Sequence, residues 1–338
     1  MFSLPMRQKD EGYCNLQTWD SRAKQQPVQY NLTSKTIIKN IKLSELLSHP
    51  LNKQRLSEVF AQLSIKRLTD LGRRFVVGYG TKIVSNITGW TRKHHDHDEA
   101  DTLIVCVAGE IARLNQSNSE FSVKILSPDT DVLMLAINYC VMCVPGCRII
   151  FELLCGKNRR ELNVDAIVNK LGEHKAKGLL GAYVCTGCDQ IGKFNSITKA
   201  RALAVFLDCP MNIVNGLSQL GDELSVVSEG TLNAVTRYVN LLYAKRKEDR
   251  DAVGKFHDTG EMRWHLFSKN QQESDMLPPT PDALKFHIQR ANFITGLWKS
   301  LIRDFNPEFF DTLENGWEDR GKTFCNNDGP AAGPGGFH

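Results

Sequence analysis

Apolar residues between positions 75 and 172 switch repeatedly between the spacing of strands and the spacing of helices. Runs rich in β-branched and aromatic residues predict strands, and runs with apolar residues three or four apart predict helices. In chain order the pattern predicts a strand or hairpin at 75–84, a helix starting at Ala100, a strand at 121–126, a buried helix at 132–139, a strand at 148–154 and a helix from Asn163 to Gly172. This alternation is typical of an α/β fold with a twisted parallel sheet covered on both faces.

The pattern becomes helical only beyond Asp189. One apolar stripe runs through Leu232, Val235, Val239 and Leu242, and a second opens at Thr280-Pro281-Asp282 and continues through Leu284, Ile288, Ala291, Thr295 and Trp298. Two short helices are expected around His49-Pro50. We therefore expect a flexible tail at 1–29, an α/β domain at 30–200, a mostly α-helical extension at 201–320 and a disordered, glycine-rich tail at 321–338.

The composition is that of a folded globular protein, with 338 residues, 41% hydrophobic and 24% charged. Lys and Arg (42) exceed Asp and Glu (38) by 42 − 38 = 4, which permits an anionic partner but is too small to indicate one. The chain contains no Walker A loop, no dinucleotide fingerprint and no Gly-x-Ser-x-Gly elbow. Nucleotide-driven and serine-hydrolase functions are therefore disfavoured.

The cysteine content and the chain's first residues predict an intracellular protein. Ten cysteines in so long a chain do not form a dense disulfide framework, and residues 1–13 carry charges where a signal peptide would be apolar. The longest uncharged stretch, 132–147, has only 16 residues and contains Pro145 and Gly146. It is too short and too interrupted to span a membrane, so no membrane partner is expected.

Three short acidic motifs stand where predicted strands meet helices: Asp98-Glu99-Ala100-Asp101, Ser127-Pro128-Asp129-Thr130-Asp131 and Thr186-Gly187-Cys188-Asp189. Loops at the carboxyl ends of parallel strands meet at one edge of a sheet, so these acids are expected to converge there. Clustered carboxylates take up protons unless a cation neutralises them, and oxygen ligands favour Mg²⁺ or Mn²⁺. Each motif alone is better explained as a helix cap, but the three in order favour a metal site.

The same motifs carry a resemblance. Their order resembles that of the flap endonuclease and XPG branch of the PIN-like nuclease superfamily. More closely, together with Leu277-Pro278-Pro279-Thr280, they look like an invertebrate family of PIN-like proteins expanded with mobile elements. The resemblance covers roughly residues 30–317 and implies a Rossmann-like PIN domain with metal-dependent nuclease activity. It assigns metal binding to Glu99, Asp101, Asp129, Asp131 and Asp189, and catalysis to Asp129 and Asp131.

Two features depart from that family pattern. The superfamily's first metal-binding Asp ends an N-terminal strand, and no apolar strand ending in Asp precedes Ser44. Where relatives carry a Phe-x-Gly-Lys-Gly-Lys-like segment, this chain reads Phe194-Asn195-Ser196-Ile197-Thr198-Lys199. We therefore expect the C-terminal part of a longer family member that is by itself a poor or inactive nuclease. The alternative is a catalytically inactive, mobile-element-derived module that binds nucleic acid or protein.

Basic residues supply candidate contacts to a nucleic-acid backbone. Lys157, Arg159 and Arg160 lie in a predicted strand-to-helix connection, and Lys193 and Lys199 follow the third acidic motif. We expect these residues to bind nucleic acid, with DNA favoured over RNA and the nucleus as one possible location. The sequence leaves the oligomeric state open.

Other clusters have simpler explanations. Cys-x-x-Cys spacing occurs among Cys140, Cys143, Cys147, Cys185 and Cys188, but these lie in apolar segments, so a structural zinc is disfavoured. His94, His95 and His97 fit a solvated loop better than a metal site. Trp264, Phe286 and Trp298 are expected in the core.

Overall fold

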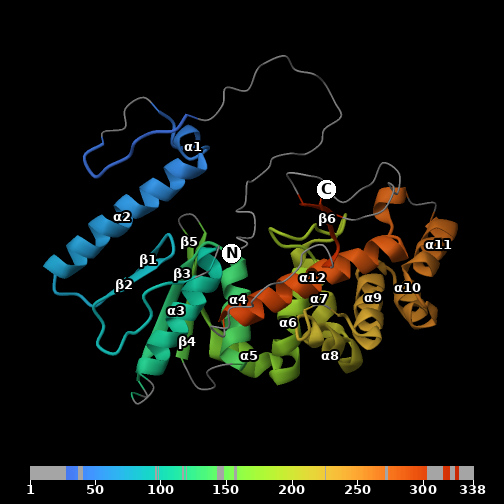
Figure 1. Cartoon of the computed structure of the whole chain (residues 1–338). Helices are drawn as coiled ribbons and strands as arrows, with labels where there is room; N and C mark the ends of the chain where they lie inside the picture. The colour runs from blue at the N-terminus through green and yellow to red at the C-terminus, as the bar shows by residue number, and fades with distance from the viewer. Residues whose placement is uncertain are drawn as a thin grey trace. The chain divides into compact units, whose positions relative to one another are not determined.

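A computed structural model of the chain divides into two compact units, Met1–Glu99 and Ala100–His338 (Figure 1). The structure describes residues 28–36, 41–95, 97, 99–115, 118, 120–142, 148–155, 158–224, 226–270, 273–302, 315–319 and 324–326. Most of the expected flexible tail at 1–29 lies outside these residues. The two units are described separately below.

In its described residues, the first unit contains two helices and a hairpin. Its elements are α1 (Leu43–Leu46), α2 (Pro50–Asp70), β1 (Val76–Tyr79) and β2 (Lys82–Ser85), with β1 and β2 antiparallel. Helix α2 begins after His49, whose Nδ1 accepts a hydrogen bond from the Leu51 amide at 3.2 Å. The expected break at His49-Pro50 and the hairpin at 75–84 are confirmed. Helix α2 has 21 residues and is therefore longer than the short helix expected after the break.

The second unit is mixed α/β, as expected. Its first half contains α3 (Ala100–Leu114), β3 (Ser122–Ser127), α4 (Thr130–Met142), β4 (Arg148–Cys155), β5 (Asn158–Asn163), α5 (Val164–Leu171) and α6 (Glu173–Cys185). The helical half contains α7 (Lys199–Asp208), α8 (Met211–Gln219), α9 (Glu229–Tyr243), α10 (Lys247–Ala252), α11 (Thr259–Asn270) and α12 (Pro281–Ile302). Among the described residues, no helix is long and apolar enough to cross a membrane.

Two strands follow the last helix. Strands β6 (Trp317–Asp319) and β7 (Phe324–Asn326) pair antiparallel, so part of the expected tail at 321–338 is a strand. The expected domain boundary after residue 200 falls inside α7.

The three-stranded sheet has the order β3-β4-β5 and is not wholly parallel. Strands β3 and β4 run parallel with Ile125 opposite Phe151, whereas β4 and β5 run antiparallel. The expectation of a purely parallel sheet is therefore corrected. Strand β5 follows β4 so closely that only a hairpin can join them, since a parallel partner needs a long crossover. Its sequence, Asn158-Arg-Arg-Glu-Leu-Asn163, hides the strand because it is mostly polar and exposed.

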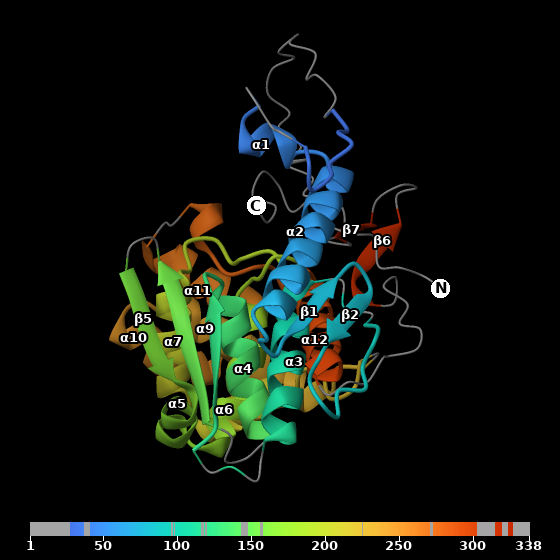
Figure 2. The ribbon, with the colours of Figure 1, turned by 90° about the vertical axis from the view of Figure 1, so that its left-hand side faces the viewer.

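The two faces of this sheet differ. Ile125 and Phe151 lie in the hydrophobic core, and helices α3, α4 and α5 pack against the strands. On the opposite face the Leu126 side chain is 51% exposed. Figure 2 faces the sheet and shows helices of the same unit behind it. The sequence predicted that both faces of the sheet are covered, but the face that carries Leu126 is exposed at that residue.

Helix α6 is the central helix of the second unit and packs against α4, α5, α7, α8 and α12. Glycines make its contact with α8 possible. A Cβ atom at Gly178 would lie 2.9 Å from the carbonyl oxygen of Val214, and one at Gly181 would lie 2.1 Å from that of Leu217. The backbones of α6 and α8 therefore touch directly, and any side chain at these glycines would separate them.

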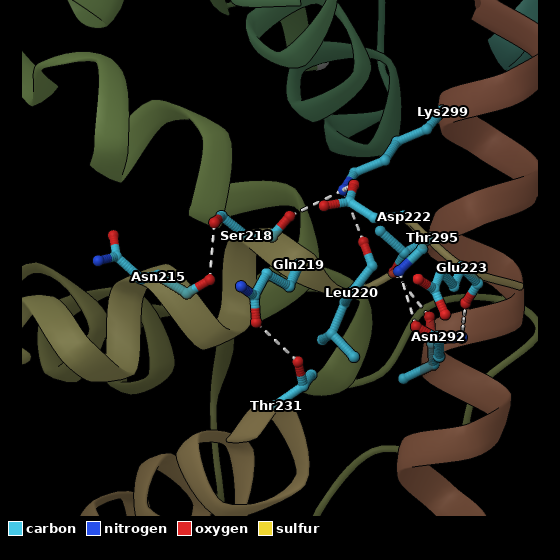
Figure 3. Close-up of polar contacts among 12 residues, drawn as sticks. Asn215, Ser218, Gln219, Leu220, Asp222, Glu223, Thr231, Asn292, Thr295 and Lys299 are labelled. Atoms are coloured by element: carbon cyan, nitrogen blue, oxygen red, sulfur yellow. Dashed lines mark hydrogen bonds and ion pairs between the residues drawn. The ribbon is translucent and has the colours of Figure 1, made fainter. Parts of the chain in front are cut away.

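Polar contacts hold the turn after α8 to α12 (Figure 3). The Lys299 ammonium donates to the carbonyl oxygens of Ser218 (2.9 Å) and Leu220 (2.6 Å), and to the Asp222 carboxylate (2.8 Å). The Gly221 amide donates to Asn292 Oδ1 at 2.7 Å. These bonds satisfy carbonyl groups at the end of α8 that have no partner within that helix.

The α6–α8 contact predicts a large effect of a single methyl group. Gly181→Ala is expected to destabilise the protein by about 1–3 kcal/mol, because the new Cβ forces two packed backbones apart. Gly254→Ala is the matched control, since no atom lies within 4 Å of the Cβ it would add. The measurement is urea unfolding of both variants. Equal stability of the two variants would contradict the direct backbone contact.

Candidate functional site

The second acidic motif forms the start of helix α4. The Asp129 amide donates to Ser127 Oγ at 3.0 Å, and the Asp131 amide donates to Asp129 Oδ1 at 2.9 Å. Ser127 ends strand β3, so the motif lies at the carboxyl end of a strand. These bonds cap the helix and also hold Asp129 and Asp131 close to each other.

The residue Asp131 is only 8% exposed, and its carboxylate receives a hydrogen bond from another helix. The Tyr183 hydroxyl, near the end of α6, donates to Asp131 Oδ1 at 2.5 Å and lies 2.9 Å from Thr130 Oγ1. Burial raises the pKa of Asp131, the charges of Asp129 and Asp189 raise it further, and Tyr183 and Lys199 oppose this shift. Asp189 therefore interacts electrostatically with Asp131.

Lys199, the first residue of α7, completes this cluster. Its Nζ donates to the Tyr183 carbonyl oxygen at 2.5 Å and to Thr186 Oγ1 at 3.3 Å, and lies 3.6 Å from the centroid of the Tyr183 ring. Much of the side chain is exposed, but the ammonium lies against α6, and this desolvation lowers the pKa of Lys199 to about 8. The five residues Asp129, Asp131, Tyr183, Asp189 and Lys199 are called the acid cluster below.

The third acidic motif is a tight turn after α6, so its predicted place between a strand and a helix is wrong: it follows a helix. Gly187 has a φ of 104°, and a Cβ there would lie 2.8 Å from the Lys193 Cα. The Cys188 and Ile191 amides and carbonyls bond to each other at 3.1 and 3.2 Å. Only glycine fits at position 187, and this geometry places Asp189 on the exposed side of the turn.

Of the five predicted metal ligands, the structure brings the charges of Asp129 and Asp189 close enough to Asp131 to affect its pKa. Glu99 ends the first unit, and Asp101 lies in the first turn of α3, which packs against α4. Within the described ranges, no three His, Cys, Asp or Glu side chains form a group that could hold a metal ion. Mg²⁺ needs only one or two protein carboxylates because it keeps several waters. Asp129 and Asp131 meet that smaller requirement, with Asp189 nearby.

The predicted nucleic-acid contacts are dispersed. Lys157 lies outside the described residues, and Arg159 and Arg160 belong to strand β5 rather than to a strand-to-helix connection. Arg159 pairs with the buried carboxylate of Glu152 at 3.1 Å. Arg160 and Lys193 are exposed. Arg159 therefore compensates a buried charge, whereas Arg160 and Lys193 remain accessible to an anion.

The cysteine and histidine candidates show no shared metal geometry in the part of the chain that the structure describes. Cys143 and Cys147 fall outside it. Burial raises the pKa of Cys185 and of Cys188 to about 12, so both thiols are protonated at neutral pH. The rings of His95 and His97 lie 5.8 Å apart.

The expectation for the aromatic residues holds in part. Trp298 is 2% exposed, as expected, but Trp264 is 70% exposed, so its predicted place in the core is wrong. Helix α11 buries Met262 and Leu266, which directs Trp264 away from the core. Trp264 lines a groove of about 360 Å³ with Gly260, Arg263, Phe267, Ser274 and Leu277.

Sequence reasoning missed Tyr183. Its only local signal is an aromatic hydroxyl among small and apolar residues, just before Thr186-Gly187-Cys188-Asp189. The contact that makes Tyr183 part of the site is its hydrogen bond to Asp131, which is far away in the sequence. Comparison of the chain with protein-family models, curated proteins and solved structures gives no match. The geometry of the acid cluster is therefore the basis for a functional proposal.

A strained residue lies between the third acidic motif and α7. Ser196 has a φ of 59°, in the left-handed region that favours glycine. Ser196→Gly is therefore expected to stabilise the protein by about 0.5–1 kcal/mol, because relief of strain exceeds the entropy that glycine adds to the unfolded chain. Ser196→Ala keeps the strain and is expected to give no gain. Thermal unfolding of both variants compares them, and an equal gain from Ala would contradict the explanation.

A buried histidine supports the same end of α6. His287 Nε2 lies 2.7 Å from the Cys185 carbonyl oxygen, and its ring centroid is 4.5 Å from that of Phe194. Burial lowers the pKa of His287 to about 4. Between pH 6.5 and pH 4 the unfolded chain binds a proton that the folded chain does not, so stability falls as the pH falls.

This difference predicts an acid-labile fold. Because of the lowered pKa of His287, the free energy of unfolding is expected to fall by up to about 3 kcal/mol as the pH falls from 6.5 to 4. His287→Gln should be less stable at pH 7 but should lose less stability on acidification. Exposed His174 supplies the control, His174→Gln, which should keep the original pH dependence. Unfolding by urea at several pH values tests this, and an unchanged slope in His287→Gln would contradict it.

Proposed function

We propose that this chain is a relative of the PIN-like nucleases, in the flap endonuclease and XPG branch, that binds Mg²⁺ or Mn²⁺ at the acid cluster and acts on nucleic acid. The observation that carries the proposal is the nearly buried Asp131 carboxylate, held beside Asp129 and in the field of Asp189. Asp129 and Asp131 would hold the ion, and Asp189 would add charge. DNA is the favoured substrate, as in the resembling family.

Electrostatics support a cation at this position. Burial is the main reason that the pKa of Asp131 is raised, and repulsion from the charges of Asp129 and Asp189 raises it further. A divalent cation bound there would relieve the repulsion, and when bound it would supply an activated water and neutralise charge on a phosphodiester. The chain's own part is to hold the carboxylates and to present Asp189 at the exposed side of the turn.

A second candidate function is nucleic-acid or protein binding without catalysis. It is favoured because Lys199 and Tyr183 already oppose the charge of Asp131, and because the described carboxylates do not form a three-ligand group. A weakly held ion would orient the attacking water poorly. Good positioning of reacting groups lowers the activation barrier by several kcal/mol, and this gain would be lost. We therefore expect metal binding with little or no cleavage.

The first experiment measures the melting temperature of the full chain during titration with Mn²⁺. Binding to the native state alone stabilises it, by about 2.7 kcal/mol at a concentration one hundred times Kd. The double variant Asp129→Asn with Asp131→Asn is expected to lose this effect. Asp251→Asn, at an exposed acid of α10, is expected to keep it. A melting temperature of the unmutated protein that ignores millimolar Mn²⁺ would rule out the proposed metal site.

The second experiment separates the two candidate functions. The full chain is incubated with Mn²⁺ and branched DNA, single-stranded DNA or RNA, beside the same double variant. Cleavage that requires Asp129 and Asp131 supports the nuclease. Retained Mn²⁺ binding without cleavage supports the inactive binding module.

A further inference from the structure

The proposed metal site gives no role in cation binding to Tyr183 and Lys199, although both belong to the acid cluster. We infer that Tyr183, held in place by Lys199, is a positioning residue that orients the Asp131 carboxylate and leaves Oδ2 of Asp131 as the oxygen for the cation. This inference rests on the proposed function and adds the supporting residues of the same site.

The hydroxyl of Tyr183 fixes one oxygen of Asp131. It donates to Oδ1 at 2.5 Å, and Thr130 Oγ1 lies 2.9 Å from the same hydroxyl. A short bond to an ionised acceptor is about twice as strong as a neutral one and restricts rotation of the carboxylate. Asp131 is therefore held from two directions, by the start of its own helix and by α6.

Lys199 in turn contacts Tyr183 at two places, its carbonyl oxygen and its aromatic ring. Its ammonium donates to the tyrosine carbonyl at 2.5 Å and to Thr186 Oγ1 at 3.3 Å, and lies 3.6 Å from the centre of the aromatic ring. A cation over a tyrosine ring is attracted by its electron-rich face, and a cation at the end of a helix is favoured by its dipole. Lys199 thus acts on Asp131 through Tyr183.

Loss of the Tyr183 hydroxyl has two opposite effects on cation binding. The carboxylate would become more negative, which strengthens attraction, but it would also rotate freely, which weakens coordination. Removal of a group that orients a metal ligand typically weakens metal binding 10-fold to 100-fold. The loss of orientation is therefore expected to outweigh the stronger attraction, so cation binding should weaken.

The experiment measures Mn²⁺ affinity by titration calorimetry on the full chain. Tyr183→Phe keeps the ring and removes only the hydroxyl, and it is expected to weaken binding at least 10-fold. Tyr238→Phe is the matched control, because the buried Tyr238 hydroxyl donates to the Ala202 carbonyl at 3.0 Å, away from the acid cluster. Melting in EDTA reports any general loss of stability in each variant.

Lys199 supplies the second comparison. Lys199→Met is expected to weaken Mn²⁺ binding, and Lys199→Arg is expected to restore most of it, because an Arg can donate to the same carbonyl and lie over the same ring. A merely structural lysine would change the melting temperature in EDTA without changing the Mn²⁺ affinity of the folded protein.

The outcomes separate this inference from the proposed function. Weaker binding in Tyr183→Phe with unchanged binding in Tyr238→Phe supports the positioning role. Equal affinity of Tyr183→Phe and the unmutated protein overturns the positioning role and leaves the metal site standing. No Mn²⁺ binding by the unmutated protein overturns the metal site and the positioning role together.

Discussion

Direct contact between the backbones of α6 and α8 is the constraint on which the second unit depends. Gly178 and Gly181 allow α6 to approach the carbonyl oxygens of Val214 and Leu217, where no side chain would fit. Because α6 has no side chain at these two positions, it can lie directly against α8 and also contact helices from both halves of the second unit. The position of every group at the end of α6 follows from this packing.

The end of α6 joins the helical half of the unit to the acid cluster. Its last turn carries Tyr183, which reaches Asp131, and Cys185, whose carbonyl lies against His287 of α12. The turn that follows carries Asp189. A change in the packing of α6 would therefore reach both the stability of the fold and the geometry of the carboxylates, which links the core to the proposed site.

Interactions within the chain offset part of the negative charge of the acid cluster. This partial compensation fits the proposed cation binding better than it fits catalysis. The Asp129 carboxylate caps α4 and Asp131 lies in the first turn of that helix, so part of their charge stabilises the start of α4 whether or not an ion is bound. Lys199 and Tyr183 offset part of what remains. These local interactions keep three acids close together in the folded chain, a state that otherwise costs free energy through repulsion.

The sequence by itself determined the elements whose signals are local. Capping at Asn163, the break at His49-Pro50 and the apolar stripe of α12 each depend on neighbouring residues, so each could be predicted. The first two acidic motifs could be placed at the starts of α3 and α4 for the same reason, whereas the third lies in a turn after α6. Strand β5 was missed because an exposed edge strand needs no apolar alternation. Only the tertiary structure decided that Tyr183 meets Asp131 and that Trp264 is exposed, because these outcomes depend on which face each helix turns to distant segments, a choice made by the packing of the whole unit.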